Sequence, residues 1–169
     1  MSQTEAWTIL RLITWTTDFL KKNGSESPRL DAEILLAHVR QCRRIDLYTA
    51  FDQEADEAVR TAYREMVKRR SEGMPVAYLV GKKEFYSLEF EVTPDCLIPR
   101  PETEHLVIAA LDAGKALTLG GTHGQRPIHF VDVCTGSGCV AIATAKHAPN
   151  HRFQATDISS AALQIAARN

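Results

Sequence analysis

The feature that most constrains the fold of this chain is a glycine-rich turn set among alternating strand and helix patterns. The turn spans residues 134–138 and follows a short β-branched, apolar run that is typical of a buried parallel strand. Strands are predicted on either side of the turn, at residues 128–133 and 152–156. Helices are predicted at residues 139–147 and from Ser159 or Ser160 onward. This βαβα order predicts the opening of a doubly wound α/β sheet.

Residues 1–74 show a different pattern, in which apolar residues recur every three or four positions. This spacing predicts four helices packed as one compact bundle. The first helix is expected to start at a cap from Ser2 or Thr4, and the second at Ser27-Pro28. Basic and acidic side chains are equally numerous here. The basic side of the last helix, at residues 60–70, is therefore interpreted as a solvent-exposed surface.

Beyond the bundle, the hydrophobic period changes to the alternation of a β-strand. Residues 88–93 alternate between apolar and polar side chains. We expect them to pair with residues 78–80 in a hairpin whose turn lies at residues 81–83. A helix is predicted from Pro101 to about Ala113, and a flexible loop over residues 119–125. The domain boundaries that follow are a helical bundle at 1–74, a hairpin linker at 75–98 and an incomplete α/β domain at 99–169.

Composition excludes several classes of protein. The chain has 20 basic and 21 acidic side chains and a formal net charge of −1, whereas nucleic-acid binding through phosphates needs a basic excess. No apolar run approaches the ~20 residues of a membrane span, and no secretion-signal pattern is visible. The four cysteines form no C-x-x-C pair and stand beside no histidine cluster, so no metal site is expected. These features favour a cytoplasmic protein.

The glycine-rich turn is also where the sequence predicts chemistry. Glycines let a cofactor approach the backbone closely, and the helix that begins at Cys139 directs its free N–H groups toward the same place. Asp157 lies nineteen positions after Gly138, at the carboxyl end of the second strand. A carboxylate there can accept hydrogen bonds from both hydroxyls of a ribose. Asp132, near the end of the first strand, adds a second acid.

Three interpretations of this turn remain. The spacing Gly136-x-Gly138-x-x-Ala141 satisfies the loose dinucleotide pattern, which would suit a nicotinamide-dependent dehydrogenase. Asp132 suits the anionic pyrophosphate of NAD poorly, and it suits the positive ammonium and sulfonium of S-adenosyl-L-methionine better. In the third interpretation the glycines only form a tight turn and Asp157 only caps a helix.

Four motifs occur in order along the chain. They are Tyr78-Leu79-Val80-Gly81, Glu84-Phe85-Tyr86, Leu97-Ile98-Pro99-Arg100-Pro101-Glu102-Thr103-Glu104 and Asp132-Val133-Cys134-Thr135-Gly136-Ser137-Gly138. In this order they resemble the release factor glutamine methyltransferases, the HemK/PrmC family of protein-glutamine N-methyltransferases. The resemblance covers essentially the whole chain. It implies a helical substrate-recognition domain, a hairpin linker and the first part of a Rossmann-like class I methyltransferase domain.

The resemblance also implies an activity. It is methylation of the side-chain amide nitrogen of the glutamine in the Gly-Gly-Gln motif of class 1 peptide chain release factors, with S-adenosyl-L-methionine as the donor. Carried over, the site residues are Cys134, Thr135, Gly136, Ser137 and Gly138 under the methionine part, Asp132 beside its amino-acid end, Asp157 on the ribose, and Arg100 and Pro101 at the pocket border. Cys134 stands where many relatives have glycine, and we expect it to be tolerated if its side chain points away.

One family motif is absent from this sequence. The family orients the target amide with an Asn-Pro-Pro-Tyr motif, which does not occur in these residues. Because positioning of the amide supplies much of the catalysis, no catalytic residue is assigned and the chain by itself is expected to be inactive. Residues 128–169 would expose an unpaired strand edge, so we expect them to be less ordered in isolation or to self-associate.

Three alternative functions follow from the same residues. A ribosomal-protein glutamine methyltransferase would share the cofactor loop and the Pro-Arg-Pro segment. A protein-binding module without chemistry would use only the helical bundle. A nicotinamide-dependent dehydrogenase would use the glycine turn for a dinucleotide.

Overall fold

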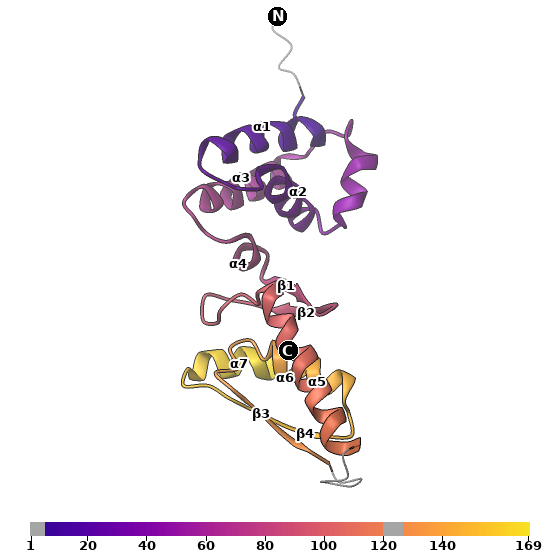
Figure 1. Ribbon diagram of the computed structural model, residues 1–169. Coiled ribbons are helices and arrows are strands. Elements are labelled where there is room, and N and C mark those ends of the chain that lie inside the picture. The colour runs from indigo at the N-terminus through magenta and orange to yellow at the C-terminus, as the bar shows by residue number, and fades with distance from the viewer. Residues whose placement is uncertain (1–5, 120–126) are drawn as a thin grey trace, which may run out of the picture. The chain divides into compact units, whose positions relative to one another are not determined.

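A computed structural model describes residues 6–119 and 127–169, without the side chain of Leu119 (Figure 1). Contacts divide the chain into two compact units, which we call the helical unit, Met1–Val80, and the α/β unit, Gly81–Asn169. The order of elements is helices, then a hairpin, then alternating strands and helices, which confirms the predicted α/β class.

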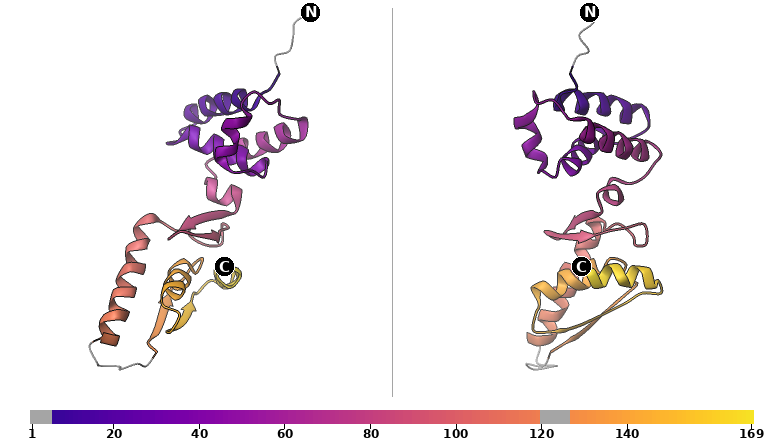
Figure 2. Two further views of the ribbon diagram at one scale, coloured as in Figure 1. Left: turned by 90° about the vertical axis from the view of Figure 1, so that its right-hand side faces the viewer. Right: turned by 180° about the vertical axis from the view of Figure 1, so that it is seen from behind.

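The helical unit forms a closed core between amphipathic helices. Its elements are α1 (Ile9–Lys22), α2 (Pro28–Val39), the 3-10 helix η1 (Arg44–Ala50), α3 (Glu57–Ser71) and the short helix α4 (Val76–Val80). Ile13 of α1 and Leu35 and Leu36 of α2 are fully buried in this core. The longer helices pack against one another (Figure 2), so each apolar stripe is covered by a neighbour.

The start of α1 differs from the prediction. Ser2 and Thr4, the predicted caps, lie outside the described residues. The helix begins after Thr8, whose Oγ1 accepts a hydrogen bond from the backbone N–H of Arg11 at 3.3 Å. Thr8 also forms an isolated β-bridge with Glu54, so the chain at Thr8 is extended and cannot belong to the helix.

The second helix begins at Pro28, as predicted, and it buries an acid that the prediction missed. Asp31 is 8% exposed, and its Oδ2 accepts hydrogen bonds from Nε of Arg70 at 2.8 Å and from Oγ of Ser25 at 2.7 Å. The interpretation of residues 60–70 as only a solvent-exposed surface is therefore wrong at Arg70. A buried carboxylate needs a partner, and α3 supplies it.

The predicted hairpin is wrong in its pairing. Residues 78–80 are helical and belong to α4, and Gly81 follows them with a φ of 76°. The hairpin consists of β1 (Lys82–Phe85) and β2 (Leu88–Glu91), which are antiparallel. Its turn is formed by Tyr86 and Ser87, with φ values of 51° and 59°. Two left-handed residues give a turn whose twist matches that of the strands, although neither residue is glycine.

The rest of the α/β unit follows the predicted order closely. After the hairpin come the 3-10 helix η2 (Pro101–Thr103), α5 (Glu104–Leu119), β3 (His129–Val133), α6 (Cys139–His147), β4 (Arg152–Thr156) and α7 (Ser160–Arg168). The predicted bounds of α6 and β4 are confirmed, and α7 is capped by Ser159. Helix α5 continues past the predicted Ala113 to Leu119. The remainder of the predicted loop, residues 120–125, lies outside the described residues.

Strands β3 and β4 are parallel neighbours. The sequence predicts β3 as a buried strand, but in the structure one of its faces is exposed. Phe130 of β3 and Phe153 of β4 stack at 5.0 Å between ring centroids, on the face covered by side chains from α5 and α6. On β3, Val131 is 54% exposed and Val133 is 69% exposed. A parallel sheet normally has helices on both faces, and in the described residues only one face of β3 is well covered.

Candidate functional site

The glycine-rich loop joins the carboxyl end of β3 to the N-terminus of α6. The backbone N–H of Thr135 donates to the carbonyl of Thr156 at 3.0 Å, which ties the loop to β4. The N–H of Gly138 donates to the carbonyl of Thr135 at 2.9 Å and closes a tight turn. Gly138 precedes α6 with a φ of 80° and has no side chain to cap the helix. The backbone of the loop therefore lies at the positive end of the helix dipole.

The two glycines of the loop have different roles. Gly136 has a φ of 56°, and a Cβ added there would meet no atom within 4 Å. A Cβ added to Gly138 would lie 3.0 Å from the Ile142 side chain and 3.1 Å from the Cβ of Ala166. Gly138 is thus required for close packing of α6 against α7. Gly136 instead exposes bare backbone to open space, where a ligand can approach.

Asp157 lies directly beside Gly136, as the spacing predicted. Its Oδ2 accepts a hydrogen bond from the N–H of Gly136 at 2.9 Å, and its Oδ1 accepts one from the N–H of Ser159 at 2.9 Å. Backbone hydrogen bonds from Ser159 and then from Gly136 hold the pKa of the Asp157 carboxyl below its usual range. The group is therefore a carboxylate at neutral pH. Each oxygen keeps a lone pair that can accept a further hydrogen bond.

Asp132 braces the loop from the β3 side. Its Oδ2 accepts a hydrogen bond from Oγ1 of Thr135 at 2.6 Å and one from the backbone N–H of Ala141 at 3.3 Å. The carboxylate thus joins the loop to the first turn of α6, where a negative charge is favourable. Asp132 and Asp157 approach the loop from neighbouring strands of the sheet.

A third set of contacts to the loop was missed by the sequence analysis. The side-chain amide of Asn169 donates to the carbonyl of Ser137 at 2.9 Å and to that of Glu91 at 3.1 Å. Its Oδ1 accepts from the N–H of Glu91 at 2.7 Å. Arg168 pairs with both oxygens of Glu91, which lowers the pKa of Glu91 and raises that of Arg168. No spacing rule joins residues 78 positions apart, so the sequence held no signal for these contacts.

The remaining loop side chains divide into exposed and buried groups. Cys134 is exposed and has a φ of 63°. This left-handed backbone conformation is less strained for glycine than for any other residue. Ser137 is 2% exposed, and its hydroxyl forms no hydrogen bond of ordinary geometry with any described residue. Burial raises the pKa of the Cys139 thiol, so this cysteine is not a nucleophile at neutral pH.

Arg100 and Pro101 lie at the start of η2, and both are exposed. Within residues 6–119 and 127–169, no hydrogen bond or ion pair joins the Arg100 side chain to the loop. The structure therefore brings together residues 134–138, Asp132 and Asp157, and it places Arg100 and Pro101 on a separate segment.

The described residues form neither a metal-ligand cluster nor a membrane-spanning helix. No group of three or more histidine, cysteine, aspartate or glutamate side chains could hold a metal ion there. Of the helices that the structure describes, none is both long and apolar enough to span a membrane.

Comparison with known proteins shows a match to one protein family and to several curated proteins. Residues 11–81 match the family described as the PrmC N-terminal domain. The release factor glutamine methyltransferase of Rhodopirellula baltica is 56% identical over 164 residues, which is 96% of this chain. This chain is homologous to the release factor glutamine methyltransferases. Proteins of the same name from Leptospira interrogans and Chlorobaculum tepidum are 40% and 36% identical over 95% and 100% of the chain.

The homology covers the loop as well as the helical unit. The match to the Chlorobaculum tepidum release factor glutamine methyltransferase extends over all 169 residues, and therefore includes the loop and Asp157. The chain spans about half the length of these relatives, 54% of two of them and 56% of the third. The Asn-Pro-Pro-Tyr motif does not occur in the 169 residues.

Proposed function

We propose that this chain supplies the cofactor site of an S-adenosyl-L-methionine-dependent methyltransferase. The substrate in this proposal is the glutamine side-chain amide of the Gly-Gly-Gln motif in class 1 peptide chain release factors. The names of the relatives support the substrate and the reaction. The single observation that supports the cofactor is the Asp157 carboxylate beside the bare backbone of Gly136.

The residues at the loop fit this cofactor. A ribose has two neighbouring hydroxyl donors, and each Asp157 oxygen has a lone pair left to accept one. The space over Gly136 admits a ligand without a steric clash. The buried hydroxyl of Ser137 interacts with the Cys139 thiol, a weak hydrogen-bonding group, and can turn toward a polar group of the ligand.

Each residue of the site has a proposed task. When bound, S-adenosyl-L-methionine supplies an electrophilic methyl group on a sulfonium. Asp157 holds the ribose, and residues 134–138 lie under the methionine part. Asp132 holds the loop in shape and places negative charge near the amino-acid end. Arg100 and Pro101 border the pocket in this proposal, which rests on the family resemblance.

The geometry at Asp132 weighs against a dinucleotide. In dinucleotide-binding folds the pyrophosphate sits on the free N–H groups at the helix N-terminus. Here the carboxylate of Asp132 already accepts from the N–H of Ala141 in that first turn. A pyrophosphate would meet a negative charge and compete for the same N–H group. A cofactor with positive groups would meet neither obstacle.

Donor binding and methyl transfer are proposed to depend on different segments. The residues expected to orient the amide do not occur in these 169 residues. Because an amide nitrogen is a poor nucleophile unless it is oriented, we expect the chain by itself to bind the donor without transferring the methyl group. In this proposal the protein is cytoplasmic, because its substrate is a peptide chain release factor.

Titration calorimetry with the 169-residue chain tests the cofactor. We expect S-adenosyl-L-methionine to bind and NAD not to bind. Asp157→Asn should weaken donor binding by at least about tenfold, because one charged acceptor is lost. Asp112→Asn is the matched control, since Asp112 is an exposed carboxylate paired with Lys115 on α5, and it should bind as the wild type does. Preference for NAD, or equal binding by the two variants, would contradict the proposal.

A methyl-transfer assay tests the substrate. The enzyme is a version of the chain extended through an Asn-Pro-Pro-Tyr motif, and the acceptors are a release factor and total ribosomal protein. Transfer to the release factor supports the proposal. Transfer only to a ribosomal protein would assign the other glutamine substrate, and absence of transfer to either would favour a binding module.

A further inference from the structure

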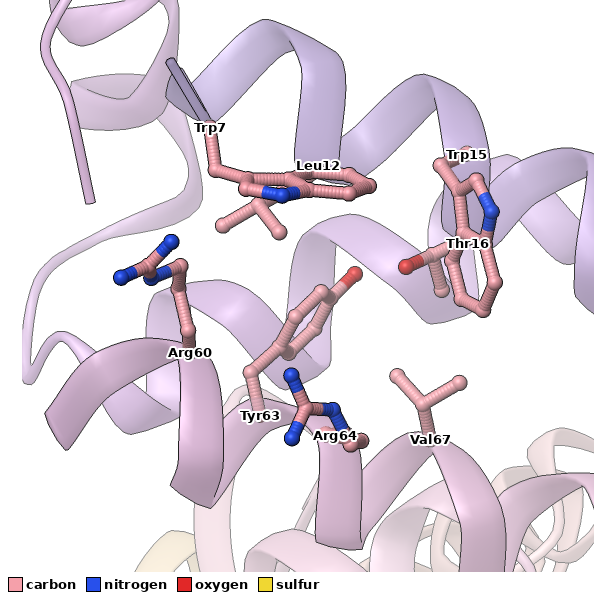
Figure 3. A pocket seen from close by; sticks show the side chains of 8 residues that line it. All are labelled: Trp7, Leu12, Trp15, Thr16, Arg60, Tyr63, Arg64 and Val67. Atoms are coloured by element: carbon pink, nitrogen blue, oxygen red, sulfur yellow. The ribbon is translucent and has the colours of Figure 1, made fainter. Parts of the chain in front are cut away.

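The helical unit carries a groove that the proposed cofactor site does not use (Figure 3). Side chains of α1 and of Trp7, two residues before it, form one side, and side chains of α3 form the other, around a volume of about 280 Å³. Trp7 and Trp15 lie at two ends of the groove, and Tyr63 lies between them. Large aromatic side chains of this kind supply rigid contact area at low entropic cost, and they are enriched among residues that dominate protein interfaces.

The exposed surface of the groove is apolar at Trp15. Trp15 is 50% exposed although it stacks on Phe19, with 5.1 Å between ring centroids. Trp7 is covered on one face by the guanidinium of Arg11, which lies 4.5 Å from the centre of a ring. The two indoles are therefore held in place by neighbours before any partner binds. A preorganised aromatic surface loses little entropy when it receives an apolar side chain.

The polar groups of the groove are cationic. Among the residues that the structure describes, Arg60 and Arg64 line it and no carboxylate does. Arg60 pairs with Glu57 through one terminal nitrogen, but its Nε is buried and has no acceptor. Arg64 is exposed and forms no ion pair with a residue in the described ranges. The exposed guanidinium of Arg64 thus presents N–H donors to a ligand that carries an anionic acceptor, and Arg60 adds positive charge beside it.

Two buried hydroxyls lie side by side in the groove. Thr16 is 1% exposed, and its hydroxyl interacts with that of Tyr63 and lowers the Tyr63 pKa. The Tyr63 hydroxyl donates to the carbonyl of Ala32 at 3.0 Å. Burial has the larger effect and raises the pKa of Tyr63, so Tyr63 remains neutral.

We propose that this groove binds an acidic peptide segment of a partner protein. The segment places one large apolar side chain between Trp7 and Trp15 and a neighbouring carboxylate against Arg60 and Arg64. The volume of about 280 Å³ lies just below the range for small-molecule pockets, about 300–1,000 Å³, and it suits a single inserted side chain. The charge of the lining is complementary to an acidic sequence.

A nucleic acid is a weaker fit to the same groove. Aromatic and arginine side chains can stack on bases, but binding of a strand also needs many cations for its phosphates. The formal net charge of the chain is −1, and in the described part of the chain two cationic side chains line the groove. The groove lies wholly within the helical unit. Failure of this proposal would therefore leave the proposed cofactor site unaffected, and the reverse also holds.

The intact chain offers a direct optical test, because its only two tryptophans are Trp7 and Trp15. Tryptophan emission is measured while three tryptophan-free peptides are added: acetyl-Glu-Leu-Phe-Glu-amide, acetyl-Lys-Leu-Phe-Lys-amide and acetyl-Glu-Gly-Gly-Glu-amide. We expect saturable binding of the first peptide. The second and third should bind at least about fivefold more weakly, because the second carries positive instead of negative charge and the third lacks the apolar anchor.

A pair of variants ties the response to the groove. Arg64→Ala should weaken binding of the acidic apolar peptide by at least about fivefold. Arg69→Ala removes an exposed cation from the same helix but outside the groove, and it should bind as the wild type does. Both residues are exposed, so both variants should keep the circular dichroism spectrum of the parent.

Several results would overturn the proposal. They are no saturable response, equal affinity for all three peptides, or a response to oligouridylate rather than to peptide. Emission that depends on protein concentration without a peptide would assign the groove to a second copy. Loss of the peptide response after removal of residues 1–5 would assign it to the N-terminus of the chain itself.

Discussion

In the helical unit, Ile13, Leu35 and Leu36 have no exposed surface, whereas Val131 and Val133 in the α/β unit are 54% and 69% exposed. The difference reflects the geometry of the elements. Amphipathic helices can cover one another in a small bundle, but a parallel strand has two faces and two edges to cover. The helical unit therefore completes its own core. The α/β unit leaves part of its sheet open, and its glycine-rich loop is fixed mainly by hydrogen bonds.

The largest expected effect compares the cores of the two units. Leu35→Ala leaves a cavity in the helical unit and should lower its free energy of unfolding by about 3 kcal/mol. Val133→Ala removes exposed methyl groups from β3 and should change the free energy of unfolding by less than about 0.5 kcal/mol. Urea unfolding followed by circular dichroism measures both. Equal losses of stability would show that β3 is as well packed as the bundle.

Hydrogen exchange compares the two units without mutation. In a dilute monomer, the backbone amides of residues 130–133 should be protected at least about a hundredfold less than those of α1 and α2, since β3 opens more easily. Protection of β3 that rises with protein concentration would indicate pairing of its exposed edge with another chain. Protection in the dilute monomer equal to that of the helices would contradict the comparison.

The two glycines of the loop provide a smaller and internally matched comparison. Gly138→Ala should destabilise the α/β unit by about 2 kcal/mol, because the added Cβ meets Ile142 and Ala166 and because φ is positive. Gly136→Ala carries only the cost of the positive φ, about 1 kcal/mol. Thermal unfolding of both variants gives the difference. A larger loss of stability for Gly136→Ala than for Gly138→Ala would contradict the assignment of the close packing to Gly138.

The pH dependence of the loop should be the smallest effect. The pKa of Asp157 is lowered in the folded chain, so its contribution to stability is complete above the ordinary carboxyl pKa of about 4 and is lost as the pH falls through the folded value. Asp157→Asn should remove this part of the acid sensitivity. The comparison is made by urea unfolding of both proteins at neutral and acid pH. An unchanged pH profile in the variant would mean that the two backbone hydrogen bonds to Asp157 are not formed in solution.

The parts of the fold that the sequence predicted best are bounded by local signals. Helix α6 lies between Gly138 and Pro149, and strand β4 lies between Pro149 and Asp157. The predicted bounds of both elements are those of the structure. Asp157 also lies at the loop as its spacing predicted, because parallel neighbours end at the same edge of a sheet.

The errors arose where a local signal was ambiguous or where a contact is long-range. The apolar run at 76–80 suits a strand as well as a short helix, and the hairpin turn at Tyr86 and Ser87 takes positive φ values without a glycine. The contacts of Asn169 with Glu91 join residues 78 positions apart. Only the assembled unit brings them together.

We propose above that a methyl donor binds at Gly136 and Asp157 of the α/β unit. The most direct measurement is a titration of the isotopically labelled chain with S-adenosylhomocysteine, followed by backbone amide chemical shifts. We predict saturable shifts at residues 134–138 and 157–159 and unchanged amides throughout α1, α2 and α3. Shifts confined to the helical unit, or no shift at Gly136 and Ser159 at saturating ligand, would contradict the account.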